Sequence, residues 1–307
     1  MKIAIMGSGG VGGYFGARFA AVGADVNFIA RGDHLAAIHK DGLQVLSANG
    51  DLTLKPVNAT SDITSIGHAD LVMLSVKLWG TEDAAQSIAP LMGPNSTVVS
   101  WQNGVVAEDI LIKRYGKERV IGGVSNIAAL IERPGVIRHN GTMARLIFAE
   151  LDGKTTPRID ALAALCKQAN IDHVVSDDIT RAIWQKFIFL ASFSGMTCAT
   201  RSAIGPIRED VDTRALLKGA LAEVVAIGRA KGVALPADQV EQSLTWADNL
   251  PATMVASMLG DLNRGNRLEL PWLSGTVVKL GKELGIAMPV HQFFYSVLKL
   301  HADGKKA

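Results

Sequence analysis

The chain has 307 residues, of which 48% are hydrophobic and 20% charged, and its formal net charge is +2 at pH 7. This length predicts two domains, and so small a net charge argues against nucleic acid or an anionic membrane as the partner. No apolar run reaches the roughly 18 residues of a membrane span, and the N-terminus lacks a signal-peptide pattern. The two cysteines are far apart in sequence, which predicts free thiols and a cytoplasmic location. The histidines lack metal-ligand spacing, so no metal site is expected.

The segment from Met1 to Gly13 predicts a dinucleotide-binding turn. Lys2 to Met6 is an apolar run typical of a strand buried on both faces, and a helical pattern starts near Tyr14. Such a turn needs glycines for tight backbone geometry and close approach of a pyrophosphate, and the helix N-terminus faces the phosphates. A second predicted strand supports this over a glycine-rich turn in an unrelated sheet. The G-x-G-x-x-G residues are Gly7, Ser8, Gly9, Gly10, Val11 and Gly12.

The end of the second predicted strand, over residues 25–30, indicates which dinucleotide binds. NAD sites usually place Asp or Glu there for the ribose 2′-hydroxyl, whereas an arginine accommodates a 2′-phosphate. Here Arg31 follows the strand, and its planar guanidinium suits a phosphate. We expect the nearby Asp33 to cap a helix that begins around His34. The sequence therefore predicts NADP(H), and the alternative role for Arg31 is a solvated loop charge.

The following segments alternate between strands and helices, which is typical of an α/β Rossmann-type doubly wound parallel sheet. Ligands of such sheets bind beyond the carboxyl ends of the strands. Lys77 and Asn103 both follow predicted strands, so we expect them to converge on the cofactor site. The alternative for each is a loop residue that satisfies local backbone groups. The predicted strands here cover residues 70–77, 96–101 and 120–125, with a helix over residues 81–91.

From Pro134 the pattern becomes antiparallel and predicts a hairpin with its turn at Asn140-Gly141. A helix over residues 158–169 and a short strand near His173 complete a first domain, which we place at residues 1–175. Beyond Ser176 the strand patterns stop, so residues 176–307 are predicted to form an all-helical second domain. Its first helix is expected to start after a cap at residues 176–178 and to end near residue 199. Further helices are expected over residues 213–231, 236–247, 271–284 and 289–301.

Lys186 stands within a helical segment that is apolar on most faces. Burial of an unpaired lysine is costly and lowers its pKa. We interpret Lys186 as a catalytic proton donor at an interdomain cleft, against the alternative that its ammonium reaches the surface on a buried stem. Leu190 and Ser194 follow at i+4 and i+8, so they share its face and should help to line the substrate pocket.

A second polar cluster lies near the C-terminus and includes Ser257, Asp261 and Glu269. Glu269 comes just before a predicted helix start, where the helix dipole favours a carboxylate. Considered without other information, it is a capping acid paired with Arg264 or Arg267, and Ser257 is an ordinary helix serine.

The order of these motifs resembles the ketopantoate reductase (2-dehydropantoate 2-reductase) family along nearly the whole chain. The resemblance implies NADPH-dependent reduction of 2-dehydropantoate to (R)-pantoate, in pantothenate and coenzyme A biosynthesis. It further implies that Lys186 is the general acid and that Glu269 binds the substrate hydroxyl. Asn103 and Lys77 match residues near nicotinamide and substrate, and Ser257 matches a substrate-binding serine. The motifs are the glycine turn, Arg31, Val76-Lys77, Gln102-Asn103-Gly104, Trp184-x-Lys186, Ser257-Met258-Leu259-x-Asp261 and Arg267-x-Glu269.

The chain departs from the family pattern at Leu190 and Ser194, where the family typically carries asparagines. Loss of an amide leaves a polar substrate group unpaired at a cost of about 1–3 kcal/mol. A leucine there favours a more apolar or differently shaped 2-oxo acid. Two alternatives therefore stay open: a paralogous reductase or dehydrogenase of another branched 2-oxo or 2-hydroxy acid, and a non-catalytic NADPH-binding sensor. An apolar helical domain is also consistent with a homodimer.

Overall fold

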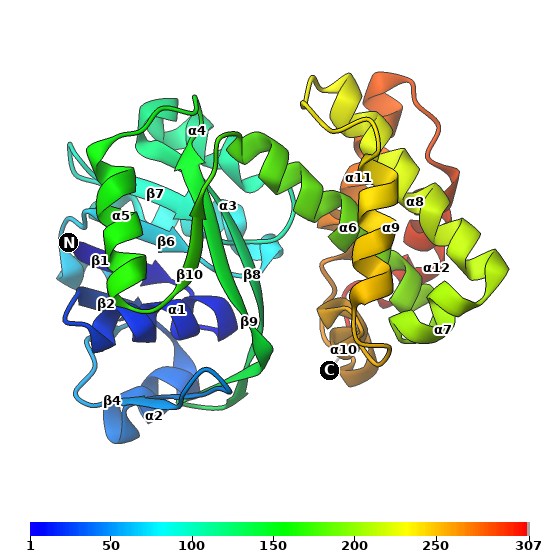
Figure 1. Cartoon of the computed structure of the whole chain (residues 1–307). Coiled ribbons are helices and arrows are strands. Elements are labelled where there is room, and N and C mark those ends of the chain that lie inside the picture. Colours follow the sequence, from blue (N-terminus) through cyan, green and yellow to red (C-terminus); the bar gives the residue numbers. More distant parts are fainter. Residues whose placement is uncertain (306–307) are drawn as a thin grey trace. The chain divides into compact units, whose positions relative to one another are not determined.

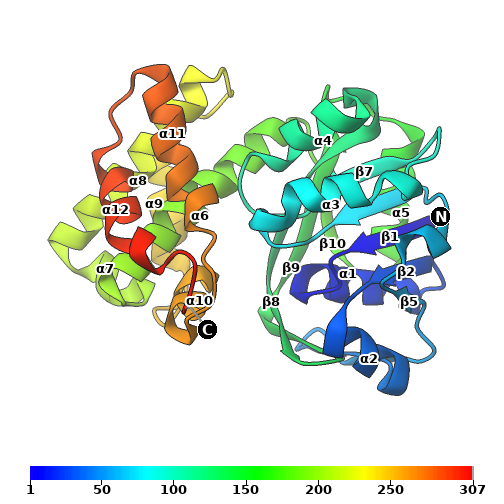
Figure 2. The same cartoon turned by 180° about the vertical axis from the view of Figure 1, so that it is seen from behind.

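The computed structural model describes residues 1–305, and the chain divides into two compact units, Met1–Ala182 and Ile183–Ala307 (Figure 1). The first unit is built on a sheet with helices on both faces, and the second is helical (Figure 2). In the described part of the chain, no helix has both the length and the apolar character that a bilayer crossing requires.

The first unit contains one ten-stranded sheet in the order β4-β3-β9-β8-β7-β6-β1-β2-β5, with β10 paired to β9. Strands β7, β6, β1 and β2 run parallel to one another, which confirms the doubly wound arrangement. The strands are β1 (Lys2–Met6), β2 (Asp25–Ile29), β3 (Leu43–Leu46), β4 (Leu52–Leu54), β5 (Ala59–Thr60), β6 (Leu71–Leu74), β7 (Thr97–Ser100), β8 (Val120–Arg133), β9 (Val136–Glu150) and β10 (Asp172–Val175).

Both faces of the parallel strands are buried, because alternate residues of β1 join two different core clusters. Ile3 and Ile5 pack with α1 and α5, whereas Ala4 and Met6 pack with α3 and α4. A strand covered on both sides reads as a continuous apolar run, which is why the sequence revealed it. The helices are α1 (Gly10–Ala21), α2 (Gly32–Asp41), α3 (Thr81–Ser87), α4 (Ala107–Tyr115) and α5 (Pro157–Gln168).

Strands β8 and β9 form a long antiparallel hairpin whose turn is not where the sequence predicted it. The connection is at Pro134-Gly135, and Gly135 has φ of +78°. Asn140 and Gly141 lie inside β9, where pairing jumps from Ala129–His139 to Ile127–Ala144. The segment between these pairs therefore protrudes as a bulge, and Gly141 has φ of +76°. An Asn-Gly pair suits such a bulge as well as a hairpin turn, so the predicted turn was wrong.

The helical unit begins within α6 (Ile179–Thr200), which continues across the division between the two units. The Oδ1 atom of Asp178 accepts a hydrogen bond of 2.9 Å from the Arg181 N–H, as expected for a capping residue. The other helices are α7 (Ile204–Glu209), α8 (Val211–Ala230), α9 (Gln239–Asn249), α10 (Ser257–Arg264), α11 (Ser274–Leu284) and α12 (Pro289–Leu298). The 3₁₀ helix η5 (Leu270–Trp272) precedes α11.

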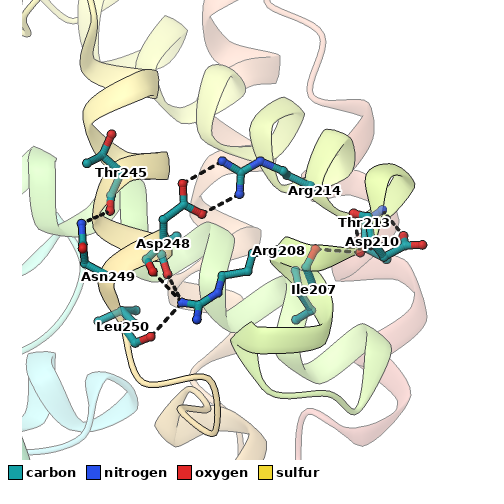
Figure 3. A network of polar contacts seen from close by, with 10 residues as sticks. Ile207, Arg208, Asp210, Thr213, Arg214, Thr245, Asp248, Asn249 and Leu250 are labelled. Atoms are coloured by element: carbon teal, nitrogen blue, oxygen red, sulfur yellow. Dashed lines mark hydrogen bonds and ion pairs between the residues drawn. The ribbon is translucent and has the colours of Figure 1, made fainter.

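A network of polar contacts fixes the end of α9, from which the chain continues to α10 (Figure 3). The Nη1 atom of Arg208 donates to three carbonyl oxygens there, at 2.7 to 2.9 Å. Arg214 makes two hydrogen bonds of 2.6 and 2.8 Å to the Asp248 carboxylate. Asp210 caps α8 by accepting from the Thr213 N–H. The network thereby ties α7 and α8 to the segment that leads to Ser257.

Candidate active site

The glycine turn connects β1 to α1 and leaves no room for side chains at two positions. A Cβ atom at Gly7 would lie 2.8 Å from the Val76 nitrogen, and one at Gly12 would clash with the Gly7 carbonyl. Gly7 also has φ of +100°, which favours glycine. By contrast, a Cβ atom at Gly9 would meet no atom within 4 Å. The turn is therefore tightly packed at Gly7 and Gly12 and borders open space at Gly9.

The groups around this turn fit a dinucleotide phosphate. The N-cap of α1 is Gly9, which has no side chain to satisfy the first N–H groups of the helix. Ser8 is buried, and its Oγ donates to the Ile29 carbonyl at 3.0 Å, which fixes the turn against β2. Near Gly12, the Oγ atom of Ser75 is buried without a hydrogen-bond partner among residues 1–305. A phosphate oxygen would accept hydrogen bonds from the first N–H groups of α1.

Arg31 is the N-cap residue of α2 and follows directly after the segment that ends β2. Its side chain is exposed, and β2, which Arg31 follows, pairs with β1, the strand that enters the glycine turn. The expected role of Asp33 was wrong, because α2 begins at Gly32 and Asp33 lies within the first helical turn. The position of Arg31 after β2 is compatible with binding of a 2′-phosphate, and this role of Arg31 stays a prediction.

Lys77 and Asn103 follow β6 and β7, which are adjacent parallel strands, so both lie at the carboxyl edge of the sheet. The Nζ atom of Lys77 lies 5.8 Å from the centre of the Trp79 ring, a cation–π contact. Gln102 belongs to the Gln102-Asn103-Gly104 motif, but the sequence assigned it no role of its own. Its Nε2 donates to the Val76 carbonyl at 2.8 Å and to Thr81 Oγ1 at 2.9 Å. It therefore holds the segments of Lys77 and Asn103 together.

In the helical unit, Lys186 on α6 interacts electrostatically with Glu269, the residue before η5. Lys186 is half-buried and Glu269 is 7% exposed. Desolvation lowers the pKa of the Lys186 ammonium to about 8, although the negative charge of Glu269 acts to raise that pKa. A lysine with this pKa exchanges its proton near neutral pH, as a general acid must. Arg264, which the sequence offered as a partner of Glu269, binds the Asp261 carboxylate at 2.9 Å through its guanidinium.

The other predicted substrate residues differ in exposure. Leu190 is half-buried one turn after Lys186. Ser194 is 1% exposed, and its buried Oγ has no hydrogen-bond partner within residues 1–305. Ser257 is exposed at the first position of α10. Contact of these three residues with a substrate stays a prediction.

Across residues 1–305, no group of three His, Cys, Asp or Glu side chains is placed to hold a metal ion. Cys166 and Cys198 are both buried and free. Burial raises the pKa of each thiol to about 12, so neither is reactive as a thiolate near neutral pH.

The chain is similar to known proteins over almost its full length. It matches the family model described as Ketopantoate reductase PanE/ApbA over residues 3–153 and the corresponding C-terminal model over residues 178–302. A 2-dehydropantoate 2-reductase of Mesorhizobium japonicum is 34% identical, with 92% of each chain covered. An uncharacterized oxidoreductase, YkpB of Bacillus subtilis, is 29% identical and covers 99% of this chain and 100% of that protein.

A solved structure agrees with these matches. The 2-dehydropantoate 2-reductase of Geobacter metallireducens superposes with a TM-score of 0.91 at 33% identity, over 98% of this chain and 99% of that one. The parallel sheet and the helical second unit are thus shared with oxidoreductases of this kind. The chain belongs to the ketopantoate reductase family.

Proposed function

We propose that the chain reduces a 2-oxo acid with NADPH, and that this substrate is 2-dehydropantoate and the product (R)-pantoate. The observation that carries the proposal is Lys186, whose pKa of about 8 and whose interaction with the buried Glu269 suit a proton donor. The reaction would serve pantothenate and coenzyme A biosynthesis in the cytoplasm. A homodimer stays a prediction.

The groups proposed to hold the cofactor are those of the first unit. The N–H groups of the glycine turn bind the pyrophosphate, and Arg31 binds the 2′-phosphate. Lys77 and Asn103 lie toward the nicotinamide and the substrate. When bound, NADPH supplies the hydride for the keto carbon.

Lys186 then donates a proton from Nζ to the carbonyl oxygen as it gains negative charge. Positioned proton donation contributes a factor on the order of 10²–10⁴ to the rate. The ammonium also stabilises the developing oxyanion before the proton moves. Glu269 accepts a hydrogen bond from the substrate hydroxyl and favours the charged form of Lys186. Ser257 is proposed as a further substrate contact.

A second candidate substrate is another branched 2-oxo acid, because of the residues that follow Lys186. Leu190 offers a substrate no hydrogen bond, whereas an amide at this position would. Such a surface suits a substrate with fewer polar groups than 2-dehydropantoate. In this case the reaction type is unchanged and only the substrate differs.

Consumption of NADPH by the purified protein, followed by absorbance, tests the proposal. The substrates compared are 2-dehydropantoate, 2-oxoisovalerate and 2-oxopantolactone. Fastest turnover of 2-dehydropantoate is the expected result. Faster turnover of 2-oxoisovalerate would favour the second candidate. Binding of NADPH without turnover of any 2-oxo acid would contradict both and indicate a non-catalytic sensor.

A further inference from the structure

His34 joins three segments of the first unit that are far apart in the sequence. It lies in the first turn of α2, after Arg31. Its Nε2 atom is 2.9 Å from the carbonyl oxygen of Ser8, in the glycine turn. Its Nδ1 atom is 3.1 Å from the N–H nitrogen of Gly135, in the turn of the β8–β9 hairpin. One side chain thus connects the glycine turn, the start of α2 and the hairpin.

These two contacts require one form of the imidazole ring. A carbonyl oxygen only accepts, so Nε2 must carry the proton that it donates to Ser8. The Gly135 N–H only donates, so Nδ1 must be unprotonated and accept. His34 is half-buried, and this burial lowers its pKa, which favours the same neutral form.

The contact with Ser8 fixes the direction of a peptide group at the cofactor turn. In a trans peptide, the C=O and the following N–H point in opposite directions. Because the Ser8 carbonyl points to His34, the Gly9 N–H points away from His34. At Gly9, a Cβ atom would find no neighbour within 4 Å, so this residue borders open space. An N–H group oriented in this way is a donor suited to a phosphate.

The hairpin supports the same turn from another direction. A Cβ atom at Gly10 would clash with the Ala129 carbonyl of β8, so the two backbones are in close contact. At Gly135, a Cβ atom would lie 3.1 Å from the Ala37 side chain of α2. The hairpin therefore packs on both α1 and α2, and His34 provides the hydrogen bonds across this junction.

We propose that His34 is a positioning residue for the dinucleotide, and that its hydrogen bond to the Ser8 carbonyl sets the phosphate-binding geometry of the glycine turn. The inference rests on the proposed function, in which NADPH binds at this turn. His34 itself touches no reacting group; it acts through the Ser8–Gly9 peptide. The bond to Gly135 holds the ring in place, and the bond to Ser8 transmits the effect.

Two substitutions separate the two bonds. His34→Gln places an amide nitrogen near the position of Nε2 and retains the donor to Ser8. His34→Asn places an amide oxygen near the position of Nδ1 and retains only the acceptor for Gly135. His39→Gln is the matched control, because His39 also lies on α2 and contacts a carbonyl, that of Ala59, at 2.8 Å.

The measurement is the Kd for NADPH, from quenching of intrinsic fluorescence, together with the Tm of each variant without cofactor. We expect His34→Asn to raise the Kd by about tenfold, the range of one lost hydrogen bond, and His34→Gln to raise it by less than about threefold. The control should leave the Kd unchanged, and the two His34 variants should share one Tm.

Equal Kd values for His34→Asn and His34→Gln would overturn the inference, and so would wild-type affinity in His34→Asn. A Kd difference matched by a Tm difference would also overturn it, because the effect would then be one of folding. Failure of the proposed function is seen separately in the wild-type protein, either as a lack of NADPH binding or as NADPH binding without turnover of a 2-oxo acid.

Discussion

At Lys186, two influences act in opposite directions on the pKa of the ammonium. Desolvation lowers it, the negative charge of Glu269 raises it, and the result is a pKa of about 8. Without the carboxylate, the buried lysine would lose its proton at still lower pH. The pair thus keeps a proton available on a group that releases it readily.

This pKa predicts the pH dependence of reduction. Because the step needs the ammonium form, kcat should be level below pH 8 and fall tenfold per pH unit above it. Replacing Glu269 by Gln removes the charge that raises the pKa, so the fall should begin at lower pH. The measurement is the pH–rate profile of both proteins. An alkaline limb that stays at the same pH in Glu269→Gln would contradict the role of the pair.

Arg31 predicts a preference between cofactors. Arg31→Ala should raise the Kd for NADPH about tenfold or more, because a charge-assisted bond to the 2′-phosphate is lost, and should leave the Kd for NADH nearly unchanged. Lys40→Ala, an exposed cation at the other end of α2, is the control. The two Kd values come from fluorescence titration. An unchanged ratio would remove Arg31 from the cofactor site.

Some residues of the candidate site could be predicted from the sequence, and others could not. The glycine turn was predictable because its glycines have the G-x-G-x-x-G spacing directly after an apolar strand. Lys186 was predictable because it is a charged residue in an otherwise apolar helical segment. No pattern in the sequence indicated the hydrogen bonds of Gln102 and His34. Their partners, Val76 and Gly135, are 26 and 101 residues away in sequence, and only the folded sheet brings them together.

Local sequence patterns predicted several strands of the sheet but not the turn of the β8–β9 hairpin. The strands β1, β6 and β7 were predictable, because burial on both faces gives a continuous apolar run. The position of the hairpin turn was not, because Asn140-Gly141 and Pro134-Gly135 carry similar turn signals. Long-range pairing of β8 with β9 decides between them. It places the turn at Pro134-Gly135 and the bulge at Asn140-Gly141.

The packing of α12 against α8 predicts an acid-sensitive helical unit. His291 on α12 is fully buried, its Nε2 lies 3.2 Å from the Ala220 carbonyl of α8, and desolvation lowers its pKa to about 4. Unfolded histidine binds a proton near pH 6.5. Stability is therefore lost as the pH falls from about 6.5 to 4, by about 2–3 kcal/mol at pH 4.5.

Urea unfolding at pH 7 and pH 4.5, followed by far-UV circular dichroism, measures this loss. His291→Gln should lose less stability than the wild-type protein between these two pH values, because it has no imidazole to protonate. Carboxylates titrate alike in both proteins and cancel in the comparison. An equal loss in both proteins would show that His291 does not contribute.

In the whole molecule, the proposed chemistry is divided between the two units. The glycine turn and Arg31 belong to the first unit, and Lys186 and Glu269 belong to the second. The proposed mechanism assigns cofactor binding to the first set of groups and proton donation to the second. Loss of the proton donor should therefore spare cofactor binding.

The most direct test compares the wild-type protein with Lys186→Ala in two assays: NADPH oxidation in the presence of 2-dehydropantoate, and the Kd for NADPH alone. We predict turnover by the wild-type protein, a kcat lower by a factor on the order of 10²–10⁴ in Lys186→Ala, and similar Kd values. No turnover by the wild-type protein, or an equal loss of kcat and of NADPH affinity in Lys186→Ala, would contradict the proposed reductase mechanism.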